Sequence, residues 1–100
     1  MNIYNKSTIA DFILKHSDCK GQLTLWYNDV SLKNWKSPKD VKRDFGTASI
    51  IGNNRVVFNV KGNKYRIIVA MNYERGWAMI KFIGTHAQYD RINAETVDNY

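Results

Sequence analysis

The chain has 100 residues, of which 44% are hydrophobic, and carries a formal net charge of +6 from 15 Lys and Arg against 9 Asp and Glu. This length suits a single domain over residues 1–100, with one core and no need of disulfides or metal ions. The lone cysteine excludes a disulfide framework, no run is apolar enough for a membrane span, and the N-terminus lacks a secretory signal. We therefore expect a cytoplasmic protein. Its net positive charge favours an acidic partner such as nucleic acid.

The first half of the chain predicts a short strand followed by helices. Residues 2–4 predict the strand, and Ser7 is a candidate N-cap for a helix that places Ile9, Phe12 and Ile13 on one face. A second helix is expected over about residues 18–33. Its apolar stripe has the spacing i, i+3, i+4, i+7 and consists of Leu23, Trp26, Tyr27 and Val30.

A third, short helix has the clearest start signal in the chain. Ser37 takes the N-cap position, Pro38 the first helical position, and Asp40 the third, where a carboxylate favours the helix N-terminus. Val41 and Phe45 are expected to face inward, and Gly46 to end the helix.

The second half changes to the alternating pattern of strands. Residues 48–51, 54–60, 65–69 and 77–83 predict four strands, joined by turns at 52–54, 61–64 and 72–76. In the turn at 61–64, Gly62 and Asn63 are the residues suited to positive φ. Helices followed by antiparallel strands predict an α+β fold, with the helices on one face of the sheet. The polar stretch 94–100 is expected to fray.

The two faces of the predicted hairpin over residues 54–69 differ in character. One face is apolar and suits a core: it carries Val56, Phe58, Val60, Tyr65, Ile67 and Val69. The other face carries residues that we call the cationic platform: Arg55, Asn59, Lys61, Lys64 and Arg66. Such a surface suits a phosphodiester backbone, although charged residues also commonly form an ordinary solvated sheet face. On the last strand, Ala78, Ile80 and Phe82 are expected to alternate with Met79 and Lys81.

The segment 84–90 after the last strand places an imidazole, a phenol and a carboxylate close together. If it is helical, Thr85 caps it, and His86, Tyr89 and Asp90 lie near one face, bordering the cationic platform and Lys81. A functional site and a simple C-terminal cap both fit this pattern. No zinc-ligand spacing or phosphate-binding glycine loop is present, and Cys19 is read as structural, so no metal or cofactor is expected.

Three segments in fixed order resemble a known family. They are Asn34–Lys42 (N-W-K-S-P-K-D-V-K), Asn54–Arg66 with its N-K-Y-R ending, and Gly84–Asp90 (G-T-H-A-Q-Y-D). Together they are similar to the HigB-type toxins of the RelE superfamily, over about residues 1–92. The resemblance implies a small twisted antiparallel sheet with helices packed on one face, like that of microbial ribonucleases.

The same resemblance implies the toxin of a bacterial type II toxin–antitoxin pair. Such toxins are metal-free endoribonucleases that cleave messenger RNA, usually on the translating ribosome. The implied partner is a HigA-type helix-turn-helix antitoxin. Arg66 matches the strand arginine of the family and is the candidate clamp for the scissile phosphate.

The chemistry implied by the family needs few groups. The ribose 2′-hydroxyl attacks the adjacent phosphate, a base removes its proton, an acid protonates the leaving oxygen, and cations stabilise the added charge. His86 and Tyr89 are the candidate acid–base pair, and Arg55, Asn59, Lys61, Lys64 and Lys81 the candidate RNA-binding residues. Two alternatives use the same surface: a non-catalytic RNA- or ribosome-binding module, and a protein-interaction domain that receives an acidic antitoxin segment.

Overall fold

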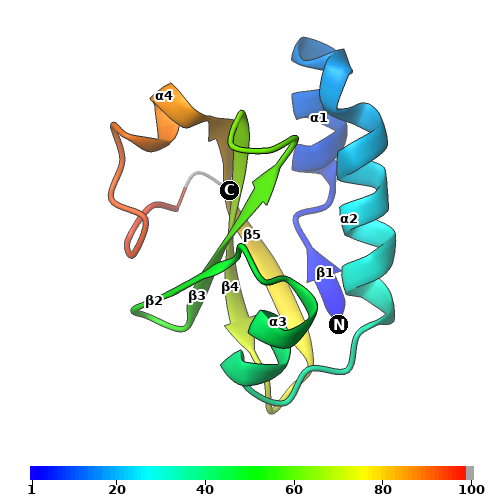
Figure 1. Cartoon of the computed structure of the whole chain (residues 1–100), viewed down its shortest axis with the longest axis vertical. Helices are drawn as coiled ribbons and strands as arrows, with labels where there is room; N and C mark the ends of the chain where they lie inside the picture. Colours follow the sequence, from blue (N-terminus) through cyan, green and yellow to red (C-terminus); the bar gives the residue numbers. More distant parts are fainter. Residues whose placement is uncertain (99–100) are drawn as a thin grey trace.

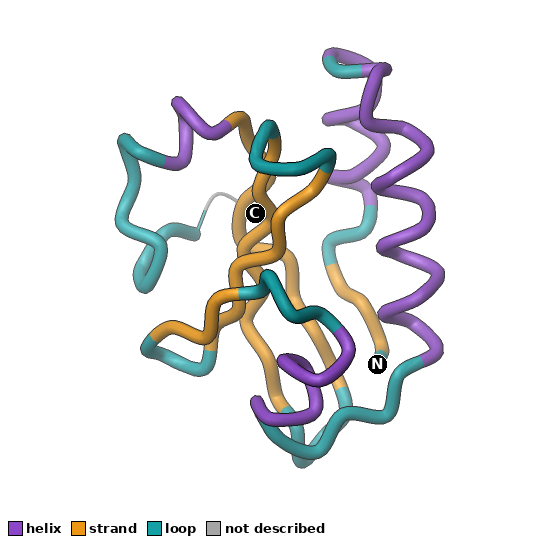
Figure 2. Tube along the Cα trace, viewed as in Figure 1, coloured by secondary structure: helices purple, strands orange, loops and turns teal. Residues whose placement is uncertain are grey.

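The computed structural model describes residues 1–98 and contains one five-stranded sheet with helices (Figures 1 and 2). Along the chain the elements are β1 (Asn2–Tyr4), α1 (Ser7–Lys15), a short 3-10 helix η1 (Ser17–Cys19), α2 (Lys20–Leu32), α3 (Pro38–Asp44), β2 (Ser49–Ile51), β3 (Arg55–Val60), β4 (Tyr65–Asn72), β5 (Trp77–Thr85) and α4 (His86–Tyr89). The spatial order of the strands is β1-β5-β4-β3-β2. The four C-terminal strands pair antiparallel, while β1 joins the edge of β5 in parallel.

The α+β prediction is confirmed. Figure 1 shows α1 and α2 on one side of the sheet and α4 on the other. The apolar stripe of α2 faces the sheet, and its residues Leu23, Trp26 and Val30 are buried. The apolar hairpin face predicted from alternation is likewise buried in the same core. Within residues 1–98, no helix has the length and apolar character needed to cross a membrane.

Aromatic rings fill the end of this core near α3. Phe58 is 1% exposed, and its ring centroid lies 5.4 Å from that of Trp26, 6.2 Å from that of Trp35 and 5.2 Å from that of Phe45. The Trp35 indole donates a hydrogen bond to Asp44 (2.9 Å), so its polar atom is satisfied at the margin of the core. These rings hold α2, α3 and β3 together.

The second face of the sheet is covered by the C-terminal segment. Val57, Ile68 and Phe82 form a smaller apolar cluster there, against which Ile92, Ala94 and Val97 pack. The expectation that residues 94–100 fray is therefore wrong for 94–98; residues 99 and 100 lie outside the described part of the chain. The polar composition of this stretch gave the wrong prediction because Ala94 and Val97 are enough to pack on the apolar cluster, while Arg55 and Lys81 bind the rest of the segment.

A β-bulge in β5 changes the faces predicted for that strand. Val69 pairs with Ile80 but Ile68 pairs with Phe82, so Lys81 is an extra residue on β5. The bulge shifts the alternation by one residue. Phe82 consequently lies on the second face, not beside Ala78 and Ile80 as predicted, and Ile83 takes the core position.

Several local predictions concern helix and turn boundaries. Helix α1 already includes Ser7, and its N-cap is Lys6, so the Ser7 prediction is wrong. Ser37 is the N-cap of α3 as predicted, but its side chain makes no capping hydrogen bond, and α3 ends at Asp44, before Gly46. In the β3–β4 turn, Lys61 and Gly62 take positive φ; Asn63 does not.

Candidate functional site

Arg66 and Tyr89 meet on the second face of the sheet. The Arg66 guanidinium carbon lies 4.6 Å from the centroid of the Tyr89 ring. In the sheet, Arg66 is flanked by Asn59 on β3 and by Gly84 on β5. Its Nε is buried with no hydrogen-bond partner, and no carboxylate among residues 1–98 forms a salt bridge with it. The arrangement leaves a positioned cation without an anion, which suits a bound phosphate oxygen.

A capping box positions the short helix α4. The Thr85 hydroxyl accepts a hydrogen bond from the Gln88 amide (3.2 Å), and the Gln88 side chain accepts one from the Thr85 amide (2.8 Å). The His86 amide also donates to the Lys64 carbonyl (3.0 Å), which ties α4 to the β3–β4 turn. These bonds confirm the predicted Thr85 cap and fix the backbone that carries His86 and Tyr89.

Gly84 lets α4 lie close against the end of the sheet. A Cβ at this position would lie 2.4 Å from the Phe82 ring and 2.8 Å from the Gln88 side-chain oxygen. Any larger residue would therefore push on the helix that carries the candidate acid–base groups. A glycine inside a strand is a signal for such a close approach, but the predicted strand ended at residue 83, whereas β5 continues to Thr85 and includes Gly84.

His86 and Asp90 form a pair on the exposed side of α4. The His86 Nδ1 lies 3.1 Å from an Asp90 carboxylate oxygen, and the two side chains are 49% and 59% exposed. The carboxylate can hold the imidazole in the tautomer that leaves Nε2 free to exchange protons. The predicted grouping is thus present: His86 and Tyr89 lie on α4, and Asp90 is its C-cap residue.

Arg55 does not lie on an open surface, so its place in the cationic platform is wrong. The residue is 6% exposed, and one guanidinium nitrogen donates to the carbonyl oxygens of Ala94 (3.1 Å) and Val97 (2.6 Å). Arg55 holds the C-terminal segment against the sheet. Its sequence position alternates with Val56 as predicted, but the segment that covers it comes from 39 residues further along the chain.

The two lysines of the β3–β4 turn are held by Asp18. The Asp18 carboxylate contacts Lys64 Nζ at 2.7 Å and Lys61 Nζ at 3.0 Å, and it accepts a hydrogen bond from the Tyr65 hydroxyl (2.7 Å). Hydrogen bonds from Lys64, Tyr65 and Lys61 hold the pKa of Asp18 well below its usual range. The same contact raises the pKa values of Lys64 and Tyr65.

The cationic platform is therefore not one continuous open surface. Lys81 pairs with Asp98 (3.1 Å), and Asn59 donates to the Thr47 carbonyl (3.2 Å). Of the predicted phosphate-binding cations, Arg66 is the one that faces Tyr89. Asp18 was missed because it precedes Lys61 by 43 residues, and nothing in local spacing connects the two.

The remaining reactive groups have structural surroundings. Cys19 is fully buried, its thiol contacts the His16 carbonyl (2.9 Å), and burial raises the pKa of the thiol, which disfavours a nucleophilic role. No group of three or more His, Cys, Asp or Glu side chains within residues 1–98 is arranged to hold a metal ion.

Comparisons with known proteins agree with the resemblance found in the sequence. A family model described as HigB toxin, a RelE-like toxic component of a toxin–antitoxin system, matches residues 19–92. The chain is also 25% identical to the mRNA interferase toxin HigB of Escherichia coli K12, in an alignment that covers 94% of this chain and 92% of the relative. The mRNA interferases HigB of Escherichia coli O157:H7 and Shigella flexneri match with the same identity and coverage.

Proposed function

Because the chain belongs to the HigB toxin family of RelE-like toxic components of toxin–antitoxin systems, we propose that it is an endoribonuclease that cleaves messenger RNA. Relatives that align with almost the whole chain are named mRNA interferases, which supports this reaction. The observation that carries the proposal is the Arg66 guanidinium, unpaired within residues 1–98 and set against the Tyr89 ring beside α4.

The proposed reaction is an attack of the ribose 2′-hydroxyl on its own 3′-phosphate. The O2′–P bond forms, the P–O5′ bond breaks, and the products are a 2′,3′-cyclic phosphate and a 5′-hydroxyl. One proton leaves O2′ and one is delivered to O5′, so a base and an acid suffice. No oxidant or second substrate is needed.

Arg66 is proposed to bind the non-bridging oxygens of the scissile phosphate. Its planar fork can donate two hydrogen bonds at once, and these strengthen as charge builds on the phosphorane. Tyr89 lies against the guanidinium and His86 lies three residues earlier on the same helix, so both can reach groups bound to that phosphate. We propose that they are the acid–base pair, with Asp90 orienting His86.

The remaining candidate residues are proposed to bind RNA outside the reacting phosphate. Asn59 is the cross-strand neighbour of Arg66, and Lys64 is 57% exposed at the end of the hairpin even while it pairs with Asp18. Lys61 and Lys81 would add positive potential near the strand. Arg55 is left out of this set because its guanidinium is occupied by the C-terminal segment.

We further propose that the chain acts in the cytoplasm on translated messenger RNA. The resemblance to the family makes ribosome-bound messenger RNA the first substrate to test. A toxic component requires a neutralising partner, and a HigA-type helix-turn-helix antitoxin is the proposed one.

Regulated expression in bacteria, followed by mapping of RNA 5′ ends, tests the proposal. The intact chain should stop growth and create new 5′-hydroxyl ends within coding regions, whereas the Arg66→Ala variant should do neither while remaining folded. New ends that appear equally with both chains would remove Arg66 from the site. Growth arrest without new ends would instead favour a non-catalytic RNA- or ribosome-binding module.

A further inference from the structure

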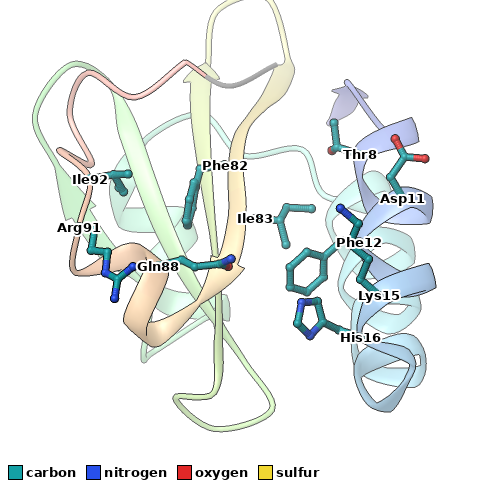
Figure 3. A pocket seen from close by; sticks show the side chains of 10 residues that line it. All are labelled: Thr8, Asp11, Phe12, Lys15, His16, Phe82, Ile83, Gln88, Arg91 and Ile92. Atoms are coloured by element: carbon teal, nitrogen blue, oxygen red, sulfur yellow. The ribbon is translucent and has the colours of Figure 1, made fainter.

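A cleft lies between α1 and the end of β5 and reaches the second face of the sheet at Phe82. It has a volume of about 520 Å³ and lies between α1, the end of β5 and residues 88–92 (Figure 3). None of the residues predicted from the sequence to bind RNA lines it. The class of ligand that suits the cleft therefore has to be inferred from the side chains that line it.

The floor of the cleft is apolar and aromatic. Phe12 and Ile83 line it on the core side of β5 and Phe82 lines it on the second face, and all three are almost fully buried. The His16 ring stacks on that of Phe12, with centroids 4.4 Å apart and planes 26° apart. The His16 ring also makes an edge contact with the Tyr65 ring (centroids 5.4 Å and planes 61° apart) and is only partly buried, so part of the imidazole is exposed at the cleft (Figure 3). A flat aromatic group can continue such a stack.

The rim of the cleft is polar and carries two cations. Lys15 on α1 and Arg91 after α4 are both exposed, and neither forms a salt bridge within residues 1–98. Asp11 is the one acidic side chain that lines the cleft, and Gln88 adds an amide. A stacked floor with two available cations suits a ligand that combines a planar ring with a phosphate.

The cleft is also continuous with the proposed catalytic site through α4. Gln88 lines the cleft, while its neighbour Tyr89 contacts Arg66. Phe82 lines the cleft as well, and Tyr89 packs against the apolar cluster that contains Phe82. Helix α4 has four residues and is about 6 Å long at 1.5 Å per residue. One strand of RNA can therefore pass from one side of α4 to the other.

We propose that this cleft binds RNA next to the cleaved bond, with one base stacked on His16 and phosphates of the strand held by Lys15 on one side and by Arg91 on the other. This inference rests on the proposed function, because it names a second point of contact for the same RNA. It assigns RNA-binding roles to residues of α1 and of the chain after α4.

The test uses short single-stranded RNA made of 2′-O-methyl nucleotides, which cannot be cleaved by 2′-hydroxyl attack, and the folded full-length chain. Chemical-shift mapping should place RNA contacts at residues 11–16 and 88–92 as well as around Arg66. Lys15→Ala and Arg91→Ala should each weaken binding on the order of tenfold and lower the salt dependence by about 0.7 in log–log slope. Lys39→Ala, which removes an exposed lysine on α3, is the matched control and should change neither value.

An abasic scan tests the stacking separately. One abasic position should weaken binding to the intact chain on the order of tenfold, in line with the loss of one base–aromatic stack. The same abasic RNA should bind the His16→Ala variant no more weakly than complete RNA does. Equal losses at that position in both chains would show that the base does not stack on His16.

Three outcomes would overturn the proposal. In the first, Lys15→Ala and Arg91→Ala bind RNA with the same affinity and salt dependence as Lys39→Ala. In the second, RNA changes chemical shifts only around Arg66. In the third, a poly-glutamate peptide changes the chemical shifts of the cleft residues while RNA does not, which would assign the cleft to a protein segment. Cleavage of unmodified RNA, supplied free and on programmed ribosomes, is measured in parallel. Cleavage that depends on Arg66 with an RNA-free cleft defeats this inference alone, whereas RNA bound in the cleft without any cleavage defeats the proposed function alone.

Discussion

Arg55 and Arg66 lie on neighbouring strands and invite opposite predictions when each is replaced by Ala. Arg55 donates two hydrogen bonds, at 3.1 Å and 2.6 Å, to carbonyl oxygens of the C-terminal segment. Hydrogen bonds that involve a charged group contribute about 1.5–3 kcal/mol each. Because one nitrogen makes both bonds and the Nε has no partner, we expect Arg55→Ala to lower the free energy of unfolding by about 2–4 kcal/mol.

The expected loss is large enough to measure directly. A domain of this size loses about 5 °C in Tm per kcal/mol, so Arg55→Ala should melt roughly 10–20 °C lower. The Val97 amide, which bonds to the Asn93 carbonyl at 2.9 Å, should lose protection from hydrogen exchange first. RNA cleavage below the melting transition should remain.

Arg66→Ala should do the reverse. Its cation–π contact with Tyr89 contributes only about 0.5–1 kcal/mol at a partly exposed site, so Tm should change by a few degrees. The single-turnover cleavage rate should fall by about a hundredfold or more, because a phosphate-binding cation is lost. The reasoning is refuted if Arg55→Ala melts normally but loses cleavage, or if Arg66→Ala unfolds.

Five further substitutions test three other parts of the structure. Phe58→Ala removes the ring at the centre of the aromatic cluster and should cost about 3–5 kcal/mol in urea unfolding, whereas Leu14→Ala, at an 85% exposed position, should cost almost nothing. His86→Gln and Tyr89→Phe should fold and still bind antitoxin, but each should lower single-turnover cleavage by about a hundredfold, with less than additive effects together; unimpaired cleavage in both would reject the acid–base assignment. The pKa of Asp18 is lower in the folded chain than the unfolded value of about 3.9, so its ion pairs stabilise the fold above about pH 4 and are lost on acidification. Asp18→Asn should therefore show a smaller drop in Tm than the intact chain between neutral pH and about pH 3, and equal drops would contradict this sign.

Local sequence patterns predicted most of the elements because their physical causes are local. The stripe of α2 and the alternation of β3 follow from burying one face of each element, and both are observed. The Thr85 cap was predictable for the same reason, since its partner Gln88 is three residues away.

The errors concern contacts between distant parts of the chain. Arg55 is held by the carbonyls of Ala94 and Val97, and Lys61 and Lys64 share one ion-pair partner, Asp18. The bulge at Lys81 moved Phe82 to the other face, and a single inserted residue leaves no clear mark in an alternating pattern. The sequence was enough to predict which strand face carries the charged residues. It was not enough to predict which of those residues remain free to bind RNA, because their partners lie far away along the chain.

The most direct test of the central claim is the chemistry of the RNA ends. A substrate with one cleavage position, supplied free and on programmed ribosomes, is compared with the same RNA carrying 2′-deoxyribose at that position. The account predicts a 2′,3′-cyclic phosphate and a 5′-hydroxyl from the unmodified RNA, and no cleavage of the deoxy-substituted RNA. Cleavage of the deoxy-substituted RNA, or products with a 3′-hydroxyl and a 5′-phosphate, would contradict attack by the 2′-hydroxyl.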